Sequence, residues 1–513
     1  MMNRRHWLKT AGLAGLAGAA CRGPVPLSAG PLGHAEGPTE PLGIPRARNI
    51  IFFVYDGTGY EDLATAEYFS TRILGRPLRF REILGRGASG SMLTHSLASV
   101  VTDSSAATSA WSTGRKIVNG ALSMFPDGRP LTTILELARE AGKATGLVTT
   151  TRITHATPAG WITRLPSRDL EDDIAEQYLD FAPEVLLGGG AGHFLAESRR
   201  DGRDLAGAFQ ARGYQVLRTR EELLASNGDR LLGIFAPGTR HLSYEIDRRF
   251  QDAPSPSLAE IAGKGLQVLE GARDGFVLQV EAGRIDHANH DNDPAGMVWD
   301  WMAAEEALGL LVDFVDRTPG TLLILAADHD TGGGTVYGFG SGYQGSTPAF
   351  QTLERQRMSL DSFNAFMGRD PSLSQIRDGT LELLGFEPTP NQTERLQQVF
   401  RREARFGHPS SHVGVLNSLH AVLSGIPAGE PDRPNLTFST GRHTAGAVPV
   451  ALYGNGVPRT ALGVVDNTRA FAWMTEALGT SFRNPEMTEE EAWTILSAAE
   501  AGAEPSFRHP QDD

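Results

Sequence analysis

Continuous apolar runs, separated by segments of helical length, dominate the hydrophobic pattern of this chain. The first run occupies residues 49–55 and ends at Asp56. Further runs cover residues 146–149, 185–187, 276–280, 322–325 and 448–453. A run without polar alternation is typical of a strand buried on both faces. Helical stretches such as 131–139 and 298–315 lie between the runs. The pattern therefore predicts an α/β fold with a mostly parallel central sheet and helices on both faces.

The remaining segments suggest how this domain is bounded. Residues 31–47 are rich in proline and glycine and predict an arm or linker. The main α/β domain is expected to span residues 48–485, followed by a tail over 486–513. Within it, residues 335–440 lose the strand–helix rhythm and show only patchy helical character. We interpret this stretch as an insertion above the active-site end of the sheet.

The first 30 residues resemble a twin-arginine export signal. Arg4 and Arg5 are followed by Trp7, Leu8 and an apolar stretch that is too short for a stable membrane span. Cys21 follows Gly-Ala-Ala, but the Leu or Val usual three residues before a lipidated cysteine is missing. Cys21 is therefore either a lipid anchor or part of the removed signal. The expected location is periplasmic or extracellular, as a free protein or a membrane-anchored lipoprotein.

Composition narrows the chemistry. The chain has 47 basic and 61 acidic residues, a net charge of −14, which argues against general nucleic-acid binding. Its single cysteine excludes an internal disulfide and any zinc site built on several thiolates. A metal ion must therefore be held by imidazole, carboxylate or hydroxyl groups.

Groups of this kind follow the predicted strands. Ligands of parallel sheets bind beyond the carboxyl ends of the strands, where these residues fall. Asp286 and His290 are four residues apart, so one helical turn would place them on the same face. Singly, each residue fits a turn, a cap or the surface, but the set indicates a metal centre. Imidazole with carboxylate suits zinc, and carboxylate with hydroxyl suits magnesium. The set comprises Asp56, Glu281, Asp286, His290, Asp328, His329 and His443.

A candidate nucleophile lies in the small-residue stretch that begins at Ser104 and ends at Gly114. The stretch predicts a helix, whose positive N-terminal end would face the Ser104 hydroxyl. A nearby divalent cation would lower the pKa of that hydroxyl and favour the alkoxide. Ser104 also fits a helix N-cap, and the two roles are compatible.

Taken together, these motifs resemble those of the alkaline phosphatase family. They occur in the family's order over residues 48–480, whereas the insertion carries no motif of the family. The matching segments are Asp56-Gly-Thr-Gly, Thr102-Asp103-Ser104, Trp111-Ser-Thr-Gly, His155-Ala-Thr157-Pro-Ala, Glu281 with Asp286 and His290, Asp328-His329, and His443-Thr.

The resemblance implies a role for each matching residue. Ser104, directly after Asp103, would be the nucleophile that forms a phosphoserine, with Ser105 as the nearest rival. Arg168 would clamp the phosphate with its two-pronged guanidinium. Two Zn²⁺ ions and one Mg²⁺ would be bound. Their ligands would be Asp286, His290 and His443 for one zinc, Asp56, Asp328 and His329 for the other, and Asp56, Thr157 and Glu281 for magnesium.

Two further positions vary within the family. His155 and His287 would lie beside the third ion, where imidazoles would favour Zn²⁺ or Co²⁺ over Mg²⁺. The alternative is that they only donate or accept hydrogen bonds around the site.

The resemblance thus implies an exported enzyme that hydrolyses small phosphomonoester substrates and releases inorganic phosphate. The family is usually dimeric, which makes a homodimer the expected assembly. Two other functions stay open at this point. One is a phosphodiesterase of the same superfamily, and the other is a catalytically inactive protein of the same fold that binds phosphate.

Overall fold

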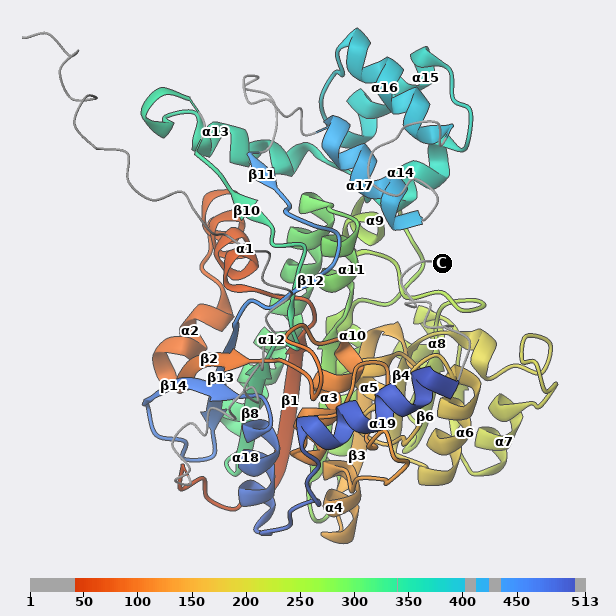
Figure 1. Cartoon of the computed structure of the whole chain (residues 1–513), viewed down its shortest axis with the longest axis vertical. Helices are drawn as coiled ribbons and strands as arrows, with labels where there is room; N and C mark the ends of the chain where they lie inside the picture. The colour runs from red at the N-terminus through yellow and green to blue at the C-terminus, as the bar shows by residue number, and fades with distance from the viewer. Residues whose placement is uncertain (1–41, 339, 402–411, 424–434, 503–513) are drawn as a thin grey trace, which may run out of the picture. The chain divides into compact units, whose positions relative to one another are not determined.

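The computed structural model describes residues 42–338, 340–401, 412–423 and 435–502, and Figure 1 shows their arrangement. The predicted export signal, Cys21 and the arm up to residue 41 lie outside the described residues. The central element is a ten-stranded sheet with the order β14-β2-β13-β8-β1-β7-β3-β4-β6-β5. Only β13 runs antiparallel to its neighbours, β2 and β8. The predicted mostly parallel sheet is therefore confirmed.

The strands of this sheet include all six predicted runs. Short β2, β5, β6 and β14 were not predicted. The bounds are β1 Asn49–Tyr55, β2 Ala88–Leu93, β3 Ala144–Arg152, β4 Val185–Gly189, β5 Gln215–Leu217, β6 Leu231–Ile234, β7 Phe276–Ala282, β8 Thr321–Ala326, β13 Val448–Gly454 and β14 Ala461–Asp466.

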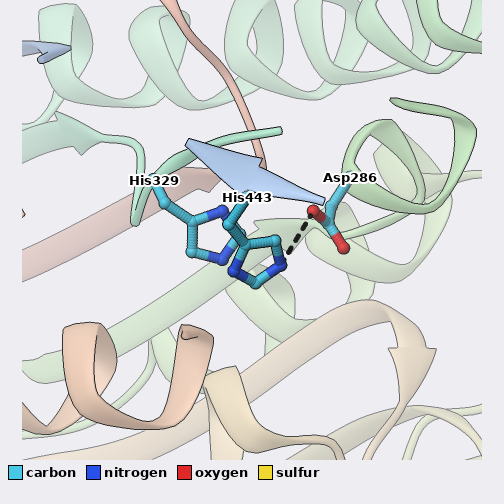
Figure 2. Close-up of side chains that lie close together, drawn as sticks. All are labelled: Asp286, His329 and His443. Carbon is cyan, nitrogen blue, oxygen red and sulfur yellow. Dashed lines mark ion pairs between the residues drawn. The ribbon is translucent and has the colours of Figure 1, made fainter. Parts of the chain in front are cut away.

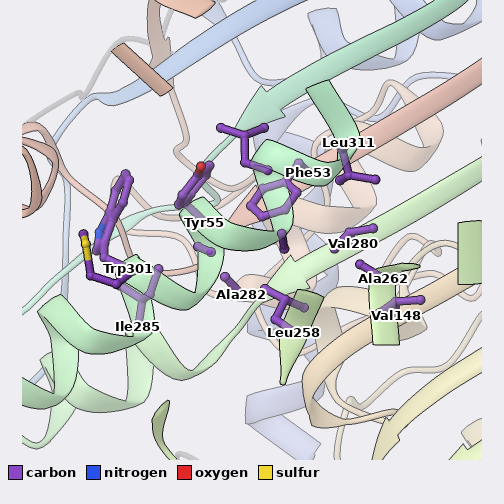
Figure 3. Packing of buried hydrophobic residues seen from close by; sticks show 14 of the residues in the cluster. Phe53, Tyr55, Val148, Leu258, Ala262, Val280, Ala282, Ile285, Trp301 and Leu311 are labelled. Atoms are coloured by element: carbon purple, nitrogen blue, oxygen red, sulfur yellow. The ribbon is translucent and has the colours of Figure 1, made fainter. Parts of the chain in front are cut away.

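The central strand β1 shows why its sequence is continuously apolar. Ile51, Phe53 and Tyr55 point into the apolar core on one face of the sheet. Ile50, Phe52 and Val54 point into a second core on the other face. Figure 3 shows Phe53 and Tyr55 packed with Trp301 and Leu311 of α12 (Pro294–Arg317). Because successive side chains of a strand alternate between faces, burial on both sides requires an apolar residue at every position.

Helices cover both faces of the sheet (Figure 1). The first core receives side chains from α1 Tyr60–Arg72, α2 Arg79–Arg86, α10 Leu258–Leu269 and α12 Pro294–Arg317. The second core receives them from α3 Ser104–Thr113, α4 Ile134–Glu140, α6 Glu171–Phe181, α7 Leu205–Ala211 and α18 Arg469–Leu478. The predicted helices 131–139 and 298–315 correspond to α4 and α12. The other helices of the sheet domain are α5 Ala156–Ala159, η1 Ala191–His193, α8 Arg220–Ala225, α9 Glu245–Phe250, α11 Arg284–His290 and α19 Glu489–Gly502.

The region predicted as an insertion forms a separate helical layer, which we call the cap. Two short strands, β10 Thr335–Val336 and β11 Leu436–Thr437, pair antiparallel and join its entry to its exit. The cap has a small apolar core, which includes Phe363, Leu396 and Leu419 and is distinct from the two cores of the sheet, but its Phe350 and Leu353 pack into the first core of the sheet. Its elements are η2 Ser341–Tyr343, α13 Ser346–Gln351, η3 Thr352–Arg355, α14 Leu360–Met367, α15 Leu373–Gly379, η4 Thr380–Leu384, α16 Pro390–Phe400 and α17 His412–Leu423.

One end of α14 attaches the cap to the sheet domain. Two buried carboxylates of the sheet domain accept hydrogen bonds there: Asp247 from the Ser359 N–H at 2.8 Å, and Asp293 from the Leu360 N–H at 2.7 Å. These N–H groups are the ones that a helix start leaves without an intrahelical partner. The cap is therefore attached by polar contacts, one of them to Asp293 in the loop that follows α11, and by Phe350 and Leu353 in the first core. Among the described helices, none has both the length and the apolar character needed to cross a bilayer.

Candidate active site

Three neighbouring strands end in buried carboxylates. Asp56 directly follows β1, Glu281 is the second-last residue of β7, and Asp328 lies two residues after β8. The three strands are adjacent, with Val54 paired to both Glu281 and Ala326. All three carboxylates are fully buried. The parallel sheet thus gathers at one edge acids that are far apart in the sequence.

A two-residue pairing brings His443 to the same edge. β9 (Asp330–Thr331) pairs antiparallel with β12 (His443–Thr444), which places His443 opposite Thr331. The rings of His329 and His443 then stack with centroids 3.5 Å apart. Figure 2 shows both rings beside Asp286, whose carboxylate lies 3.8 Å from His443 Nε2. His290 Nε2 lies 3.1 Å from His443 Nε2 and 3.3 Å from Asp286.

Hydrogen bonds fix which ring nitrogen each histidine presents. The Nδ1–H of His290 donates to the Gly441 carbonyl at 2.8 Å, and that of His443 donates to the Thr102 carbonyl at 2.9 Å. His329 Nδ1 lies 3.1 Å from the Thr331 hydroxyl, which itself donates to Asp286 at 2.6 Å. All three imidazoles therefore turn Nε2 toward the carboxylates, with the tautomer that metal coordination requires.

The resulting ligand atoms fall into three groups that could each hold an ion. The groups are Asp286 with His329 and His443, Asp56 with Asp328 and His329, and Asp56 with His155 and Glu281. Within the described residues, both oxygens of Asp56 and of Glu281 and the hydroxyl of Thr157 are buried without a hydrogen-bond partner. Buried oxygens of this kind are costly unless a donor or a cation satisfies them. The donor set therefore fits divalent cations.

Electrostatics lead to the same conclusion. Burial, followed by repulsion from Asp328, Asp286 and Glu281, raises the pKa of Asp56 well above its ordinary value. Burial also raises the pKa of Glu281 to about 7. Both carboxylates are thus destabilised in their charged form by the protein alone. A divalent cation between them would supply the missing positive charge.

Ser104 lies at the start of α3, as predicted, and faces this centre. Its hydroxyl is 3.1 Å from His329 Nε2, and the residue is buried. Ser105, the rival nucleophile, points elsewhere. Its hydroxyl donates to Asp103 at 2.7 Å and accepts from the Gly120 N–H at 3.0 Å. Ser104 therefore lies beside a metal-ligand candidate, whereas Ser105 links Asp103 to the loop that contains Gly120.

Arg168 lies in the loop before α6, and its guanidinium donates hydrogen bonds to two residues of the site. Its Nη1 donates to Asp103 at 3.2 Å, and its Nη2 donates to His155 Nε2 at 3.0 Å. Asp103 also caps α3 by accepting from the Ala106 N–H. Burial opposes the charge on Asp103, but Arg168 and these donors hold its pKa below the ordinary value. The guanidinium is therefore fixed between Asp103, the residue before Ser104, and His155.

A third histidine, not predicted from the sequence, joins the two that were. His241 lies with its ring centroid 5.6 Å from His155 and 4.3 Å from His287. Burial, together with nearby cations, lowers the pKa of all three rings well below the ordinary value. His241 is held by the main chain and side chain of Arg152. The imidazoles beside the third ligand group are therefore neutral.

The structure thus brings every sequence-predicted site residue to one edge of the sheet. The unpredicted participants are His241, Thr331 and the carbonyls of Thr102 and Gly441. A lone histidine carries no motif, and a carbonyl is the same in every residue. Thr331 is two positions after His329, Gly441 is two before His443, and Thr102 belongs to a recognised segment, but none of these segments indicates which backbone or hydroxyl group supports the ligands.

Comparisons with known proteins agree with this site. The family model described as alkaline phosphatase matches residues 47–480. The crystal structure of Thermus thermophilus alkaline phosphatase superposes with a TM-score of 0.85 and 47% identity, covering 88% of this chain and 96% of that one. Alkaline phosphatase 4 of Bacillus subtilis is 29% identical over 82% of this chain and 86% of its own length. Repressible alkaline phosphatase of Saccharomyces cerevisiae is 38% identical, but the match spans only 56% of each chain. The sheet, the ligand groups and these similarities lead to one conclusion: the chain belongs to the alkaline phosphatase family.

Proposed function

We propose that this protein hydrolyses phosphate monoesters through a phosphoserine on Ser104, at a site with two Zn²⁺ ions and one Mg²⁺. The observation that carries the proposal is the position of the Ser104 hydroxyl. It lies at a helix start, among three ligand groups, and the preceding residue, Asp103, accepts a hydrogen bond from the guanidinium of Arg168. Small phosphomonoesters are the proposed substrates, and inorganic phosphate is the proposed product.

The ions would be held as the family resemblance implies. Asp286, His290 and His443 would bind one zinc, and Asp56, Asp328 and His329 the other. Asp56, Thr157 and Glu281 would bind the third ion. Because His155 shares that last group, Zn²⁺ or Co²⁺ is the alternative to Mg²⁺ there. Bound cations would lower the pKa of hydroxyl groups and offset charge on the leaving oxygen.

The chain's own residues would perform two displacements at phosphorus. Arg168 would bind two non-bridging oxygens of the phosphate and align the ester with Ser104. The Ser104 oxygen would then form a bond to phosphorus while the ester bond to the alcohol breaks, and the alcohol leaves with a proton. In the second displacement, water attacks phosphorus, the bond to Ser104 breaks, and inorganic phosphate leaves with the serine regenerated.

Steady-state hydrolysis of p-nitrophenyl phosphate and bis(p-nitrophenyl) phosphate tests this proposal. The protein would be purified and loaded with zinc and magnesium. We expect strong monoester turnover, weak diester turnover, and a loss of at least about 10³-fold in Ser104→Ala. Ser105→Ala is the matched control, and its loss should be much smaller because Ser105 only supports Asp103.

Other results would redirect the assignment. A preference for the diester would indicate the phosphodiesterase branch. No turnover of either ester by the metal-loaded protein would favour a catalytically inactive protein that binds phosphate. An equal loss in both serine variants would contradict the assignment of Ser104 as nucleophile.

We further propose export by the twin-arginine route, on the basis of Arg4, Arg5 and the short apolar stretch that follows. Phosphate would then be released outside the cytoplasm. Replacing both arginines by lysine should leave the protein in the cytoplasmic fraction of its host. Unchanged fractionation would contradict this route. Mass spectrometry of the mature protein would show whether Cys21 carries a lipid or has been removed.

A further inference from the structure

We propose that Asn417, in helix α17 of the cap, is a positioning residue for the ion held by Asp286, His290 and His443. The inference rests on the proposed function, because it concerns the same ligand group. It gives the cap a role in the metal centre, although the insertion carries none of the recognised motifs. Asn417 does not touch the ligand atoms and acts through the backbone that carries them.

The first contact is with the end of α11. Asn417 Nδ2 donates to the His290 carbonyl at 2.8 Å. His290 is the last residue of α11, and carbonyls in the last turn of a helix have no intrahelical partner. The cap therefore supplies a donor to the residue whose ring presents Nε2 to Asp286 and His443. This contact limits movement of the His290 backbone.

The second contact is with Gly441. A Cβ atom placed on Gly441 would lie only 2.3 Å from Asn417 Oδ1 and 3.0 Å from Asn417 Cγ. The amide of Asn417 therefore lies directly against the Gly441 main chain. The Gly441 carbonyl is the acceptor for His290 Nδ1–H. One side chain thus contacts both residues of the hydrogen bond that sets the tautomer of His290.

These contacts join three separate parts of the chain. α11 carries His290 and Asp286, the loop containing Gly441 leads to His443, and α17 belongs to the cap. The cap core packs α17 against α14, which the carboxylates of Asp247 and Asp293 hold to the sheet domain. Asn417 is therefore held in place by the docking of the cap, and it links that docking to two of the three ligands.

Removal of the amide should loosen the site without unfolding it. The Gly441 loop keeps a second attachment, because the Asn292 amide, in its favoured orientation, donates to the Thr440 carbonyl at 2.9 Å. Loss of a group that orients a ligand typically costs about 10- to 100-fold in metal affinity or activity. We expect Asn417→Ala to fall at the lower end, about 10-fold, because it acts through one further contact.

The experiment measures zinc release from the reconstituted full-length protein into a chromogenic chelator. We expect Asn417→Ala and Asn417→Asp to release zinc about 10-fold faster than the parent, because neither provides an amide donor to the His290 carbonyl. Turnover should fall at limiting zinc and recover at excess zinc, a pattern that a general folding defect would not produce. Asn391→Ala, an exposed asparagine of α16 in the same cap, is the matched control and should behave as the parent.

Zinc release within twofold of the parent in both Asn417 variants would overturn the inference. Equal acceleration in Asn391→Ala would do the same. The result is separable from the proposed function, because zinc release is measured without substrate. Fast release from Asn417→Ala in a protein without phosphatase activity would sustain the positioning role and contradict only the proposed hydrolysis.

Discussion

The sheet domain and the cap differ in the size of their apolar cores and in the share of polar contacts that hold them in place. In the sheet domain, two large apolar cores lie on either side of strands such as β1, whose every side chain is buried. The cap has one small core of its own, and it joins the sheet domain both through the buried carboxylates of Asp247 and Asp293 and through Phe350 and Leu353, which pack into the first core. Apolar burial is strong and insensitive to direction, whereas hydrogen bonds are weaker but set position closely. The comparison indicates a large base that carries the ligands and a smaller layer docked onto it, with Asn417 in contact with one ligand residue.

Asp56→Asn should produce the largest effect, because Asp56 contributes to two of the three ligand groups. We expect phosphatase activity of the metal-loaded protein to fall by at least about 10³-fold, or about 4 kcal/mol in activation free energy. The metal-free protein should instead become more stable, because the pKa of Asp56 shows that its charge is disfavoured there. Steady-state hydrolysis measures the first change, and thermal unfolding of the metal-free protein measures the second. A loss of stability in the metal-free variant would contradict this account of the site.

Phe363→Ala tests whether the cap core is independent of the sheet. Phe363 is fully buried in the cap, in ring contact with Phe400. The change should cost about 3 to 5 kcal/mol and speed hydrogen exchange in α14 to α17 alone. Phe53→Ala in β1 is the matched control, for which exchange should rise across the sheet. Equal exchange changes in both regions would mean that the cap and the sheet unfold as one unit.

Glu305 provides a pH test inside the sheet domain. Its carboxylate accepts from the Phe80 N–H at 3.3 Å and the Tyr55 hydroxyl at 3.1 Å, and burial raises its pKa to about 7. The folded state therefore binds this proton more tightly than the unfolded chain does. Stability from this group is full below about pH 4.5 and is lost as the pH rises to about 7, by about 3 kcal/mol in total. Denaturant unfolding of the parent and Glu305→Gln should show the difference between them change by this amount over that range. A difference independent of pH would contradict the raised pKa.

Gln356→Ala should give the smallest effect and separates docking from positioning. Gln356 Nε2 donates to Asp293 and to the Met358 carbonyl, both at 2.9 Å. We expect a cost of about 1 kcal/mol, seen as faster hydrogen exchange at the start of α14. Zinc release should stay close to that of the parent, unlike in Asn417→Ala. Equal zinc release from the two variants would show that general attachment of the cap, and not Asn417, governs the site.

The sequence was most informative where burial is complete on both faces. The run at 49–55 predicted β1 because the strand is buried on both faces and is apolar at nearly every position, with Asn49 the one amide at its start. β14 escaped prediction because it lies at the sheet edge, where Gly463 and exposed positions interrupt the apolar run. β2, with the sequence Ala-Ser-Gly-Ser-Met-Leu, contains too few large apolar side chains to form a recognisable run. Strands at the margin of a sheet need less apolar surface and leave a weaker pattern.

The candidate site also contains residues that the sequence predicted and supporting groups that it did not. Most residues that offer a carboxylate, an imidazole or a hydroxyl at strand ends were recognisable from their motifs, with the Thr331 hydroxyl as an exception. What could not be foreseen was the support around them, such as His241 beside His287 and the Thr102 carbonyl that receives His443 Nδ1–H. Support of this kind depends on pairs of residues far apart in the chain. Such contacts form only through the tertiary fold, which a linear motif does not encode.

The pairing of β10 with β11 has a consequence for how relatives of this protein can diverge. Because Thr335 lies opposite Thr437, the whole cap begins and ends at one point on the sheet domain. A segment with adjoining ends can be lengthened, shortened or exchanged during evolution with little strain on the base. The contact of Asn417 with His290 and Gly441 limits that freedom. An exchanged cap that keeps the centre intact would need to bring its own hydrogen-bond donor to the same carbonyl.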